Sequence, residues 1–407
     1  MKDRPINNGS IKSANRLTVI RLIDELGTVS RAGIAEKIGM SKSSVSTIVE
    51  ELINAGWIQE VGLGRSTGQG GKKPVLLQIN GDSTNILAVY FSYNLVEIGI
   101  ADFHGNLMDM VSIDIDSTED PFGLFDRIIE NCRHLIEEWK LRNGQTRNVI
   151  GCGIVMKGLV DTEKGELSYS ATLRGWQNVP IGKYFSEKLG IPTFVENDAR
   201  AVTVHMLRKY KDLSPKVLMC VCVERGVGVG LAVEGQVYYG FNSGISTTHM
   251  MLDPNGPVCS CGNIGCWDVL TSIETLKNEL VKKSPKYRTM SLGQVVMSYQ
   301  NKDELVIDTE INYTEYWMKR GIVNALNCYN PDVMVLVGRY FNYFEGAAER
   351  IKEAVQNMPN SAAKRVKVIV SDRQEHLFLI SAVSVVYSAF LSEKFHQTLV
   401  DGIDNAH

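Results

Sequence analysis

The 407-residue sequence lacks long apolar runs and a strong excess of charge of either sign. A membrane-spanning helix needs roughly 18 consecutive apolar residues, and no run reaches that length. The first sixteen residues, MKDRPINNGSIKSANR, also lack the apolar stretch of a signal peptide. We therefore expect no membrane partner and a cytoplasmic location. In that reducing compartment the eight cysteines are more often metal ligands than disulfides.

The net charge of −3 argues against binding of polyanions by bulk charge, but the charge is distributed unevenly. Residues 1–80 contain 11 Lys and Arg against 7 Asp and Glu, which gives this part a net charge of +4 and the rest −7. A basic head on an acidic body indicates a small nucleic-acid-binding module joined to a part that binds something else. The length and the 44% hydrophobic content suffice for two or three domains.

The first eighty residues follow the pattern of a winged helix-turn-helix. Helical spacing of apolar residues predicts helices over 15–26 and 31–38, and a third helix that Ser41 caps and that ends near residue 54. Strands are expected at 57–61 and 75–79, on either side of a basic loop at 62–74. The alternative is a helical protein-interaction module with a solvated loop.

The side chains that we expect to contact DNA lie on the third helix and in the loop. Small hydroxyls and a lysine can bond base edges or phosphates in the major groove, and basic loop residues can contact phosphate or the minor groove. The candidates are Ser41, Lys42, Ser43, Ser44, Ser46, Thr47, Arg65, Lys72 and Lys73.

From residue 84 onward, strand and helix patterns alternate, which predicts a mixed or parallel α/β body. We expect a DNA-binding domain over 1–80 and a first lobe over 84–200. A C-terminal helix at about 379–397 is expected to pack back on that lobe. The second lobe is expected over 201–378.

Three cysteines lie within eight positions in VCSCGNIGCWD, residues 258–268, and His249 lies ten residues before the first of them. Three thiolates and one imidazole match a closed structural zinc site with four N/S ligands. Glycines at 262 and 265 let the backbone wrap around one ion. The alternatives are a redox pair, although Cys-x-Cys is not thioredoxin-type spacing, and a metal-free buried cluster. We predict a structural Zn²⁺ held by His249, Cys259, Cys261 and Cys266.

The chain after residue 84 resembles the ROK family of repressors, open reading frames and sugar kinases. The resemblance rests on GLVDTEKGELSYSATLRGWQNVPIGKYFSEKLGIPTFVENDARA, residues 158–201, and on the stretch from His249 through DPNGPVCSCGNIGCWD. The head resembles the DNA-binding domain of the family's repressors, such as the xylose repressors. The resemblance implies an actin-like, ribonuclease H-like pair of α/β lobes with a ligand cleft between them. It also assigns zinc to the same four residues.

Asn197 and Asp198 follow a predicted strand, and a carboxylate beside an amide can chelate vicinal hydroxyls. The alternative, which can coexist with ligand binding, is a helix cap. In the family's kinases the matching Asp is the general base, and the resemblance adds further sugar contacts. The set is Glu196, Asn197, Asp198, Ser246, His249 and Asp268. The family has Glu where Ser246 stands, and losing one charge-assisted bond costs roughly 1–3 kcal/mol, so we expect a different affinity or ligand.

The family's kinases bind ATP through three glycine-rich loops, and all three are altered here. The first, Asp-x-Gly-Gly-Thr, corresponds to residues 90–94, which read YFSYN. Glu224 and Arg225 precede the second, GVGVG, and the third is reduced to Gly338-Arg339-Tyr340. We expect the remaining glycines to serve tight strand turns, and we expect no ATP and no catalytic residue.

Together these patterns predict a sugar-responsive transcription regulator, most simply a repressor of carbohydrate-utilisation genes. It would bind operator DNA as a homodimer, with a tetramer as the alternative, and bind a sugar or sugar derivative without phosphorylating it. Two other hypotheses remain open. One is a ROK sugar kinase with an accessory DNA-binding head. The other is a regulator that has lost sugar binding and responds to a protein partner.

Overall fold

The computed structural model describes residues 8–64, 73–81, 84–144, 148–241, 246–358 and 365–392. The chain divides into two compact units. The first unit comprises Met1–Ile154, Pro180–Val195 and Ala382–His407, and the second comprises Val155–Val179 and Glu196–Ser381. This division differs from the expected lobes, because the winged-helix region joins the first unit and residues 155–179 join the second.

The N-terminal region has the predicted helix-turn-helix order and a small sheet of order β1-β3-β2. Its elements are α1 (Asn8–Leu26), β1 (Val29–Ser30), α2 (Arg31–Ile38), α3 (Lys42–Asn54), β2 (Ile58–Leu63) and β3 (Val75–Ile79). Gly39 ends α2 with φ 69°, a left-handed conformation that glycine adopts without strain. The first helix begins seven residues earlier than predicted, while α2 and α3 have the predicted bounds.

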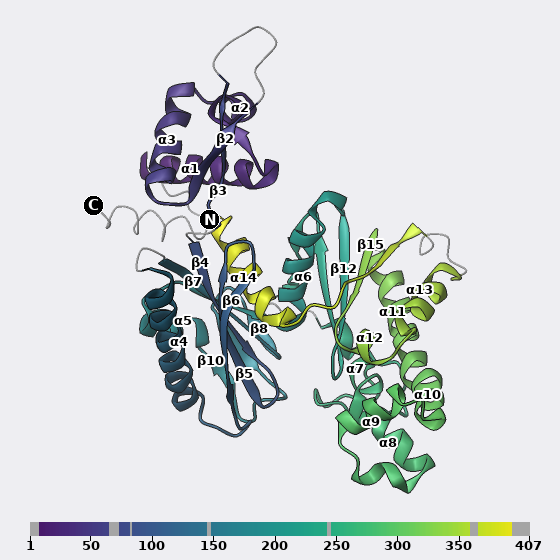
Figure 1. Cartoon of the computed structure of the whole chain (residues 1–407). Coiled ribbons are helices and arrows are strands. Elements are labelled where there is room, and N and C mark those ends of the chain that lie inside the picture. The colour runs from purple at the N-terminus through teal and green to yellow at the C-terminus, as the bar shows by residue number, and fades with distance from the viewer. Residues whose placement is uncertain are drawn as a thin grey trace. The chain divides into compact units, whose positions relative to one another are not determined.

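The first unit contains a five-stranded sheet of order β11-β7-β4-β5-β6. Its strands are β4 (Thr84–Phe91), β5 (Leu95–Asp102), β6 (Leu107–Asp114), β7 (Asn148–Met156) and β11 (Thr193–Asn197). Figure 1 shows α4 (Pro121–Asn143) and α5 (Ile181–Leu189) on one face and α14 (Leu377–Phe390) on the other. The backbone of α14 approaches β7 closely, because a Cβ on Gly153 would lie 2.2 Å from the carbonyl oxygen of Ala382.

The second unit contains a three-stranded sheet of order β10-β9-β8 and a five-stranded sheet of order β14-β13-β12-β15-β16. The strands are β8 (Leu159–Asp161), β9 (Glu166–Tyr169), β10 (Gln177–Val179), β12 (Val217–Val223), β13 (Val227–Val233), β14 (Gln236–Val237), β15 (Val333–Val337) and β16 (Lys367–Val370). The α-helices are α6 (Asp198–Lys209), α7 (Trp267–Leu270), α8 (Ile273–Lys283), α9 (Leu292–Gln300), α10 (Glu304–Thr309), α11 (Tyr316–Tyr329), α12 (Tyr340–Tyr343) and α13 (Ala347–Gln356). The shorter turns are η1 (Lys211–Leu213), η3 (Thr247–His249), η4 (Pro285–Thr289) and the π-helix η5 (Glu310–Glu315).

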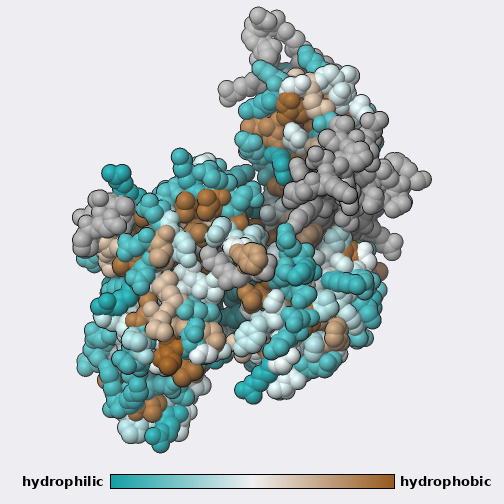
Figure 2. Space-filling view, turned by 180° about the vertical axis from the view of Figure 1, so that it is seen from behind, coloured by the Kyte–Doolittle hydropathy of each residue, from teal (hydrophilic) through white to brown (hydrophobic). Residues whose placement is uncertain are grey.

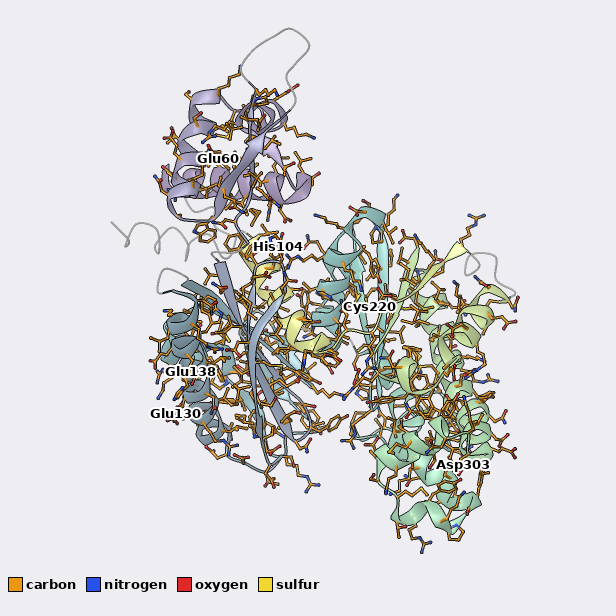
Figure 3. The ribbon with its side chains drawn as sticks, viewed as in Figure 1. Glu60, His104, Glu130, Glu138, Cys220 and Asp303 are labelled. Carbon is orange, nitrogen blue, oxygen red and sulfur yellow. The ribbon has the colours of Figure 1, made fainter. Side chains whose placement is uncertain are left out.

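Side chains of β12 alternate between two buried faces, as a period of two requires. Met219 and Val221 join a core cluster that also contains Ile322 of α11. Cys220, labelled in Figure 3, and Cys222 are fully or nearly fully buried on the opposite face. These two cysteines therefore pack as small hydrophobic residues.

The C-terminal helix ends at Phe390, and its expected extension beyond residue 392 lies outside the described residues. Between residues 310 and 329 the chain forms η5 followed by α11. Cys328, near the end of α11, is exposed.

None of the helices in the described segments is both long and apolar enough to span a membrane. On the face shown in Figure 2, hydrophobic residues lie in small groups separated by hydrophilic ones.

Candidate DNA-binding surface, ligand site and metal centre

The start of α3 presents a cluster of hydroxyl groups. Ser41 Oγ accepts a hydrogen bond of 3.1 Å from the backbone N of Ser44, which makes Ser41 the N-cap of the helix. The same Oγ lies 2.9 Å from Ser43 Oγ and 2.8 Å from Ser44 Oγ. The exposed residues of the predicted set are Ser41, Lys42, Ser43, Ser44, Thr47 and Lys73, and Ser46 is partly exposed. Arg65 and Lys72 lie outside the described residues.

A buried ion pair fixes this helix against the rest of the head. Arg16 of α1 is 4% exposed and its Nε and Nη2 lie 2.8 Å and 2.6 Å from the carboxylate of Glu51 on α3. Both guanidinium nitrogens approach the same oxygen, Oε2, and the pair holds α1 and α3 together. Nothing in the local sequence pattern distinguishes these two residues from other charged residues on helices.

The Asn197–Asp198 pair lies where β11 meets α6. Asn197 caps the helix, because its Oδ1 accepts from the backbone N of Ala199 at 3.0 Å and of Arg200 at 3.3 Å. Its Nδ2 donates to the carbonyl of Gly158 at 3.1 Å and to Asp198 Oδ1 at 3.0 Å. The capping role is therefore present, and the second carboxylate oxygen of Asp198 points to a different partner.

That partner is Lys157, whose Nζ lies 4.0 Å from Asp198 Oδ2. Asp268, at the start of α7, joins the same group: its Oδ1 accepts from the backbone N of Val227 at 3.0 Å. This approach requires glycine at 226, since a Cβ there would lie 2.2 Å from Asp268 Oδ1. Burial raises the pKa of both aspartates, and the Lys157 ammonium opposes the rise in each. Two carboxylates and one ammonium thus share a sheltered site.

Glu196 does not belong to this group, although the sequence suggested that it contacts sugar. Its side chain is 1% exposed and its Oε1 lies 2.7 Å from Nε of Arg200. The carboxylate also accepts from Thr162 Oγ1 at 3.1 Å and from the backbone N of Asn197 at 2.7 Å. A buried carboxylate requires such partners, so its oxygens are used inside the fold.

Ser246 is exposed and precedes the turn η3, where its carbonyl accepts from the backbone N of His249 at 3.2 Å. Its contact with a sugar stays a prediction.

The four predicted metal ligands lie together. His249 Nδ1 is 3.5 Å from Cys259 Sγ, and Cys261 Sγ is 3.7 Å from Cys266 Sγ. All four ligand atoms lie within 4.8 Å of one another. A tetrahedral zinc ion with ordinary bond lengths separates two sulfurs by about 3.8 Å and a sulfur from a nitrogen by about 3.6 Å. The separations within the His249–Cys259 and Cys261–Cys266 pairs match these values.

Tight backbone turns form this cluster. Antiparallel bridges join Met251 to Cys266 and Val258 to Ile264. Gly265 has φ 61°, and a Cβ there would lie 1.6 Å from the carbonyl oxygen of Asp253, so no other residue fits. Burial raises the pKa of the Cys266 thiol to about 12. Such a thiol stays protonated at neutral pH unless a cation lies beside it.

Two glycines of GVGVG, Gly228 and Gly230, serve helix packing, which corrects our expectation of tight strand turns at these positions, whereas Gly226 does lie in the turn between β12 and β13. Gly228 and Gly230 lie two residues apart on β13 and face α6. A Cβ on Gly228 would lie 2.8 Å from Ala199 Cβ, and one on Gly230 would lie 1.9 Å from Thr203 Oγ1. Side chains at these positions would push α6, and with it Asp198, away from the sheet.

Glu224 and Arg339 come from the second and third altered loops, and they bind each other. The carboxylate of Glu224 accepts from the backbone N of Arg339 at 2.8 Å and pairs with its Nε. Glu224 is buried, whereas Arg339 is largely exposed. The two residues that replace phosphate-binding positions thus form one ion pair.

A winged helix joined to an α/β body with a polar site at a helix N-terminus defines a DNA-binding regulator with a ligand-binding body. Two family models match the chain: the ROK family over residues 98–381 and the MarR family over residues 12–60. The chain belongs to the ROK family.

Relatives along the whole length are repressors and regulators. The xylose repressor of Caldicellulosiruptor bescii is 26% identical over 403 residues, with 95% of this chain and 98% of that protein covered. The DNA-binding transcriptional dual regulator NagC of Escherichia coli is 25% identical over 408 residues, with 96% of each covered.

Solved structures share the fold. A ROK family transcriptional regulator, a homologue of the E. coli MLC protein, has a TM-score of 0.79 at 22% identity and covers 96% of this chain and 100% of its own. A ROK family glucokinase from Streptomyces griseus, in complex with glucose and AMPPNP, has a TM-score of 0.63 at 18% identity and covers 74% and 98%. The N-terminal winged helix followed by an actin-like ROK body is therefore confirmed.

Proposed function

We propose that the protein is a transcriptional repressor that binds operator DNA through its winged helix and releases it when a sugar or sugar derivative occupies the body. The observation that carries this proposal is the presence in one chain of an exposed, hydroxyl-rich recognition helix and the Lys157–Asp198–Asp268 site. The xylose repressor and the N-acetylglucosamine repressor among the relatives also support a repressor function.

Within this proposal, Asp198 and Asp268 accept hydrogen bonds from sugar hydroxyls, and Asn197 holds the start of α6 in place. The Ser246 hydroxyl and the ring of His249 complete the set. The His249, Cys259, Cys261 and Cys266 cluster holds Zn²⁺, supported by tetrahedral separations and an N/S donor set. The ion supplies no chemistry, since four protein ligands leave it no open position. It fixes the loop that carries His249 and Asp268.

The protein does not phosphorylate its ligand. Phosphate binding by a glycine-rich turn depends on free backbone N–H groups and on the absence of negative charge. At one such turn the Glu224 carboxylate accepts the backbone N–H of Arg339, and its charge would repel a nucleotide. At another, Tyr90 stands where the family's kinases have the Asp of Asp-x-Gly-Gly-Thr, and its ring is buried in β4.

Two heads are needed to read a palindromic operator, so the active form is a homodimer or a tetramer built from it. The ligand changes affinity for DNA by favouring a body conformation that holds the two heads at a spacing unsuited to the half-sites. The protein acts in the bacterial cytoplasm, where its operator lies.

One experiment tests the proposal. Duplexes recovered by in vitro selection on the purified protein would be used in an anisotropy assay, with D-xylose, D-glucose and N-acetyl-D-glucosamine added separately. We expect one sugar to raise Tm and weaken DNA binding, and we expect Asp198→Ala to bind DNA but not respond. Sugar-dependent ADP formation from ATP would establish the kinase instead. DNA binding with no sugar response would favour a regulator controlled by a protein partner.

A further inference from the structure

The segment from Ser371 through the C-terminal helix α14 connects the two units covalently, with bonds to α6 in the second unit and contacts with β7 and the head in the first. Its residues Leu377–Ser381 belong to the second unit and Ala382–Phe390 to the first. Figure 1 shows it in yellow beside the sheet of the first unit, below the winged helix.

Before α14 begins, the chain is bonded to the C-terminal half of α6. His205 Nε2 lies 3.1 Å from Gln374 Oε1, and Lys209 Nζ lies 3.3 Å from Ser371 Oγ. Burial lowers the pKa of His205 to about 4, so this imidazole is neutral at pH 7 and donates to the amide oxygen. The N-terminus of the same 12-residue helix is Asp198, the candidate sugar contact. Occupancy at Asp198 and the position of residues 371–374 are thus linked through one rigid helix.

Along its middle, α14 lies directly on the backbone of β7. A Cβ on Gly151 would lie 3.1 Å from Val386, and one on Gly153 would lie 2.2 Å from the carbonyl oxygen of Ala382. Because β7 has no side chain at these two positions, the helix lies close to the strand, and the two cannot slide independently without opening a gap or a clash. The chain that follows β7 carries Lys157, the cation of the ligand site.

The last turn of α14 holds the winged helix. Phe390 stacks on Trp57 with ring centroids 4.3 Å apart and an interplanar angle of 19°. The hydroxyl of Tyr387 donates to Asp24 of α1, and Arg21 Nε donates to the carbonyl of Leu391 at 2.6 Å. An aromatic stack and two polar contacts therefore attach the head to the end of this helix.

We propose that α14 is the element that transmits ligand occupancy to the DNA-binding head. Gln374, just before α14, and Tyr387, in its last turn, act as positioning residues. Two sites communicate when both bias the same structural element; here the segment that leads into α14 is bonded to α6, and the last turn of α14 is bonded to the head. This inference rests on the proposed function, but its main test uses the protein without any sugar.

The test measures whether a change at Gln374, in the second unit, reaches Trp57 in the first. Full-length protein labelled with 5-fluorotryptophan would be studied by ¹⁹F NMR, with the Trp57 resonance assigned from Trp57→Phe. Gln374→Ala removes the bond to His205, while Gln374→Glu keeps an acceptor oxygen. Gln300→Ala, at an exposed position of the same unit, is the matched control.

We expect Gln374→Ala to shift the Trp57 resonance and to change affinity for the selected duplex at least threefold, with Gln374→Glu close to wild type and Gln300→Ala without effect. Tyr387→Phe should produce the same two changes from the other end. If Tyr387→Phe alters the Trp57 signal but Gln374→Ala alters neither it nor DNA affinity, the contact is structural and the proposal is wrong. If the wild-type protein binds no duplex, the proposed function is wrong. The coupling through α14 is then tested by whether Gln374→Ala shifts the Trp57 resonance.

Discussion

The ring of His249 is expected to serve two roles through its two nitrogens, and one substitution separates them. Nδ1 lies 3.5 Å from Cys259 Sγ, so we expect a bound metal to use this nitrogen and Nε2 to be available to a sugar hydroxyl. His249→Cys replaces an imidazole ligand by a thiolate that reaches a metal at a similar distance from Cβ. The site then has four sulfurs, which zinc accepts as readily as three sulfurs and a nitrogen.

The magnitude follows from what is removed. One zinc ion should remain in His249→Cys, while one hydrogen bond to sugar is lost. A single such bond contributes about 0.5–1.5 kcal/mol, which corresponds to roughly 2- to 13-fold weaker sugar binding. His249→Ala removes both functions, so we expect it to lose zinc and to lower Tm as well.

The assay combines zinc content by atomic emission, Tm, and sugar affinity by calorimetry with the sugar that stabilises the wild type. His134→Cys places a thiol at an exposed histidine of α4 and serves as the control for an added cysteine. Loss of zinc from His249→Cys would show that the ligand set is misassigned. Full zinc and unchanged sugar affinity would show that His249 does not touch the ligand.

Three further predictions concern the other sites. Burial raises the pKa of Asp198, so its ionised form destabilises the fold above that pKa, and this cost disappears as pH falls through it. Asp198→Asn should therefore match or exceed the wild-type Tm at pH 7, lose that advantage in acid and bind sugar less well. Thermal melts at several pH values and calorimetry with the sugar would measure these changes. Ser41→Ala removes an N-cap worth about 0.5–2 kcal/mol and should lower the free energy of unfolding in chemical denaturation, whereas Ser46→Ala should not. Equal free energies of unfolding for the two variants would contradict the capping role of Ser41. Arg339→Ala leaves the buried Glu224 carboxylate with one partner fewer and should cost about 1–3 kcal/mol, and Glu224→Gln in the same chain should recover most of it in urea unfolding.

Features that depend on local spacing could be predicted from the sequence. The bounds of α2 and α3, the N-cap at Ser41 and the metal cluster all arise from residues close together in the chain. A helix repeats every 3.6 residues and the cysteine loop closes within eight, so each feature is determined by residues a few positions apart in the sequence. The N-cap role of Asn197 could also be predicted, because a short polar residue between a strand and a helix is a local signal.

Features that depend on contacts between distant segments could not be predicted. Lys157 joins the candidate ligand site from the end of β7, and a lone lysine has no spacing that marks it. Glu196 stands in the expected motif, but its partners Thr162 and Arg200 are brought to it by other elements and bury its carboxylate. The topology of the sheet decides which residues at the end of a strand face a site. A short sequence motif carries no information about that topology.

The two altered phosphate loops are best understood together. A buried carboxylate with no partner costs several kcal/mol, so glutamate at 224 is tolerable only if another group neutralises it. Arg339, which lies 115 positions away, provides both a backbone N–H and a guanidinium. An arginine at 339 with a neutral residue at 224 would have no carboxylate to bind, and a glutamate at 224 with glycine at 339 would lose its cation. The two departures from the kinase pattern therefore depend on each other and form one internal ion pair.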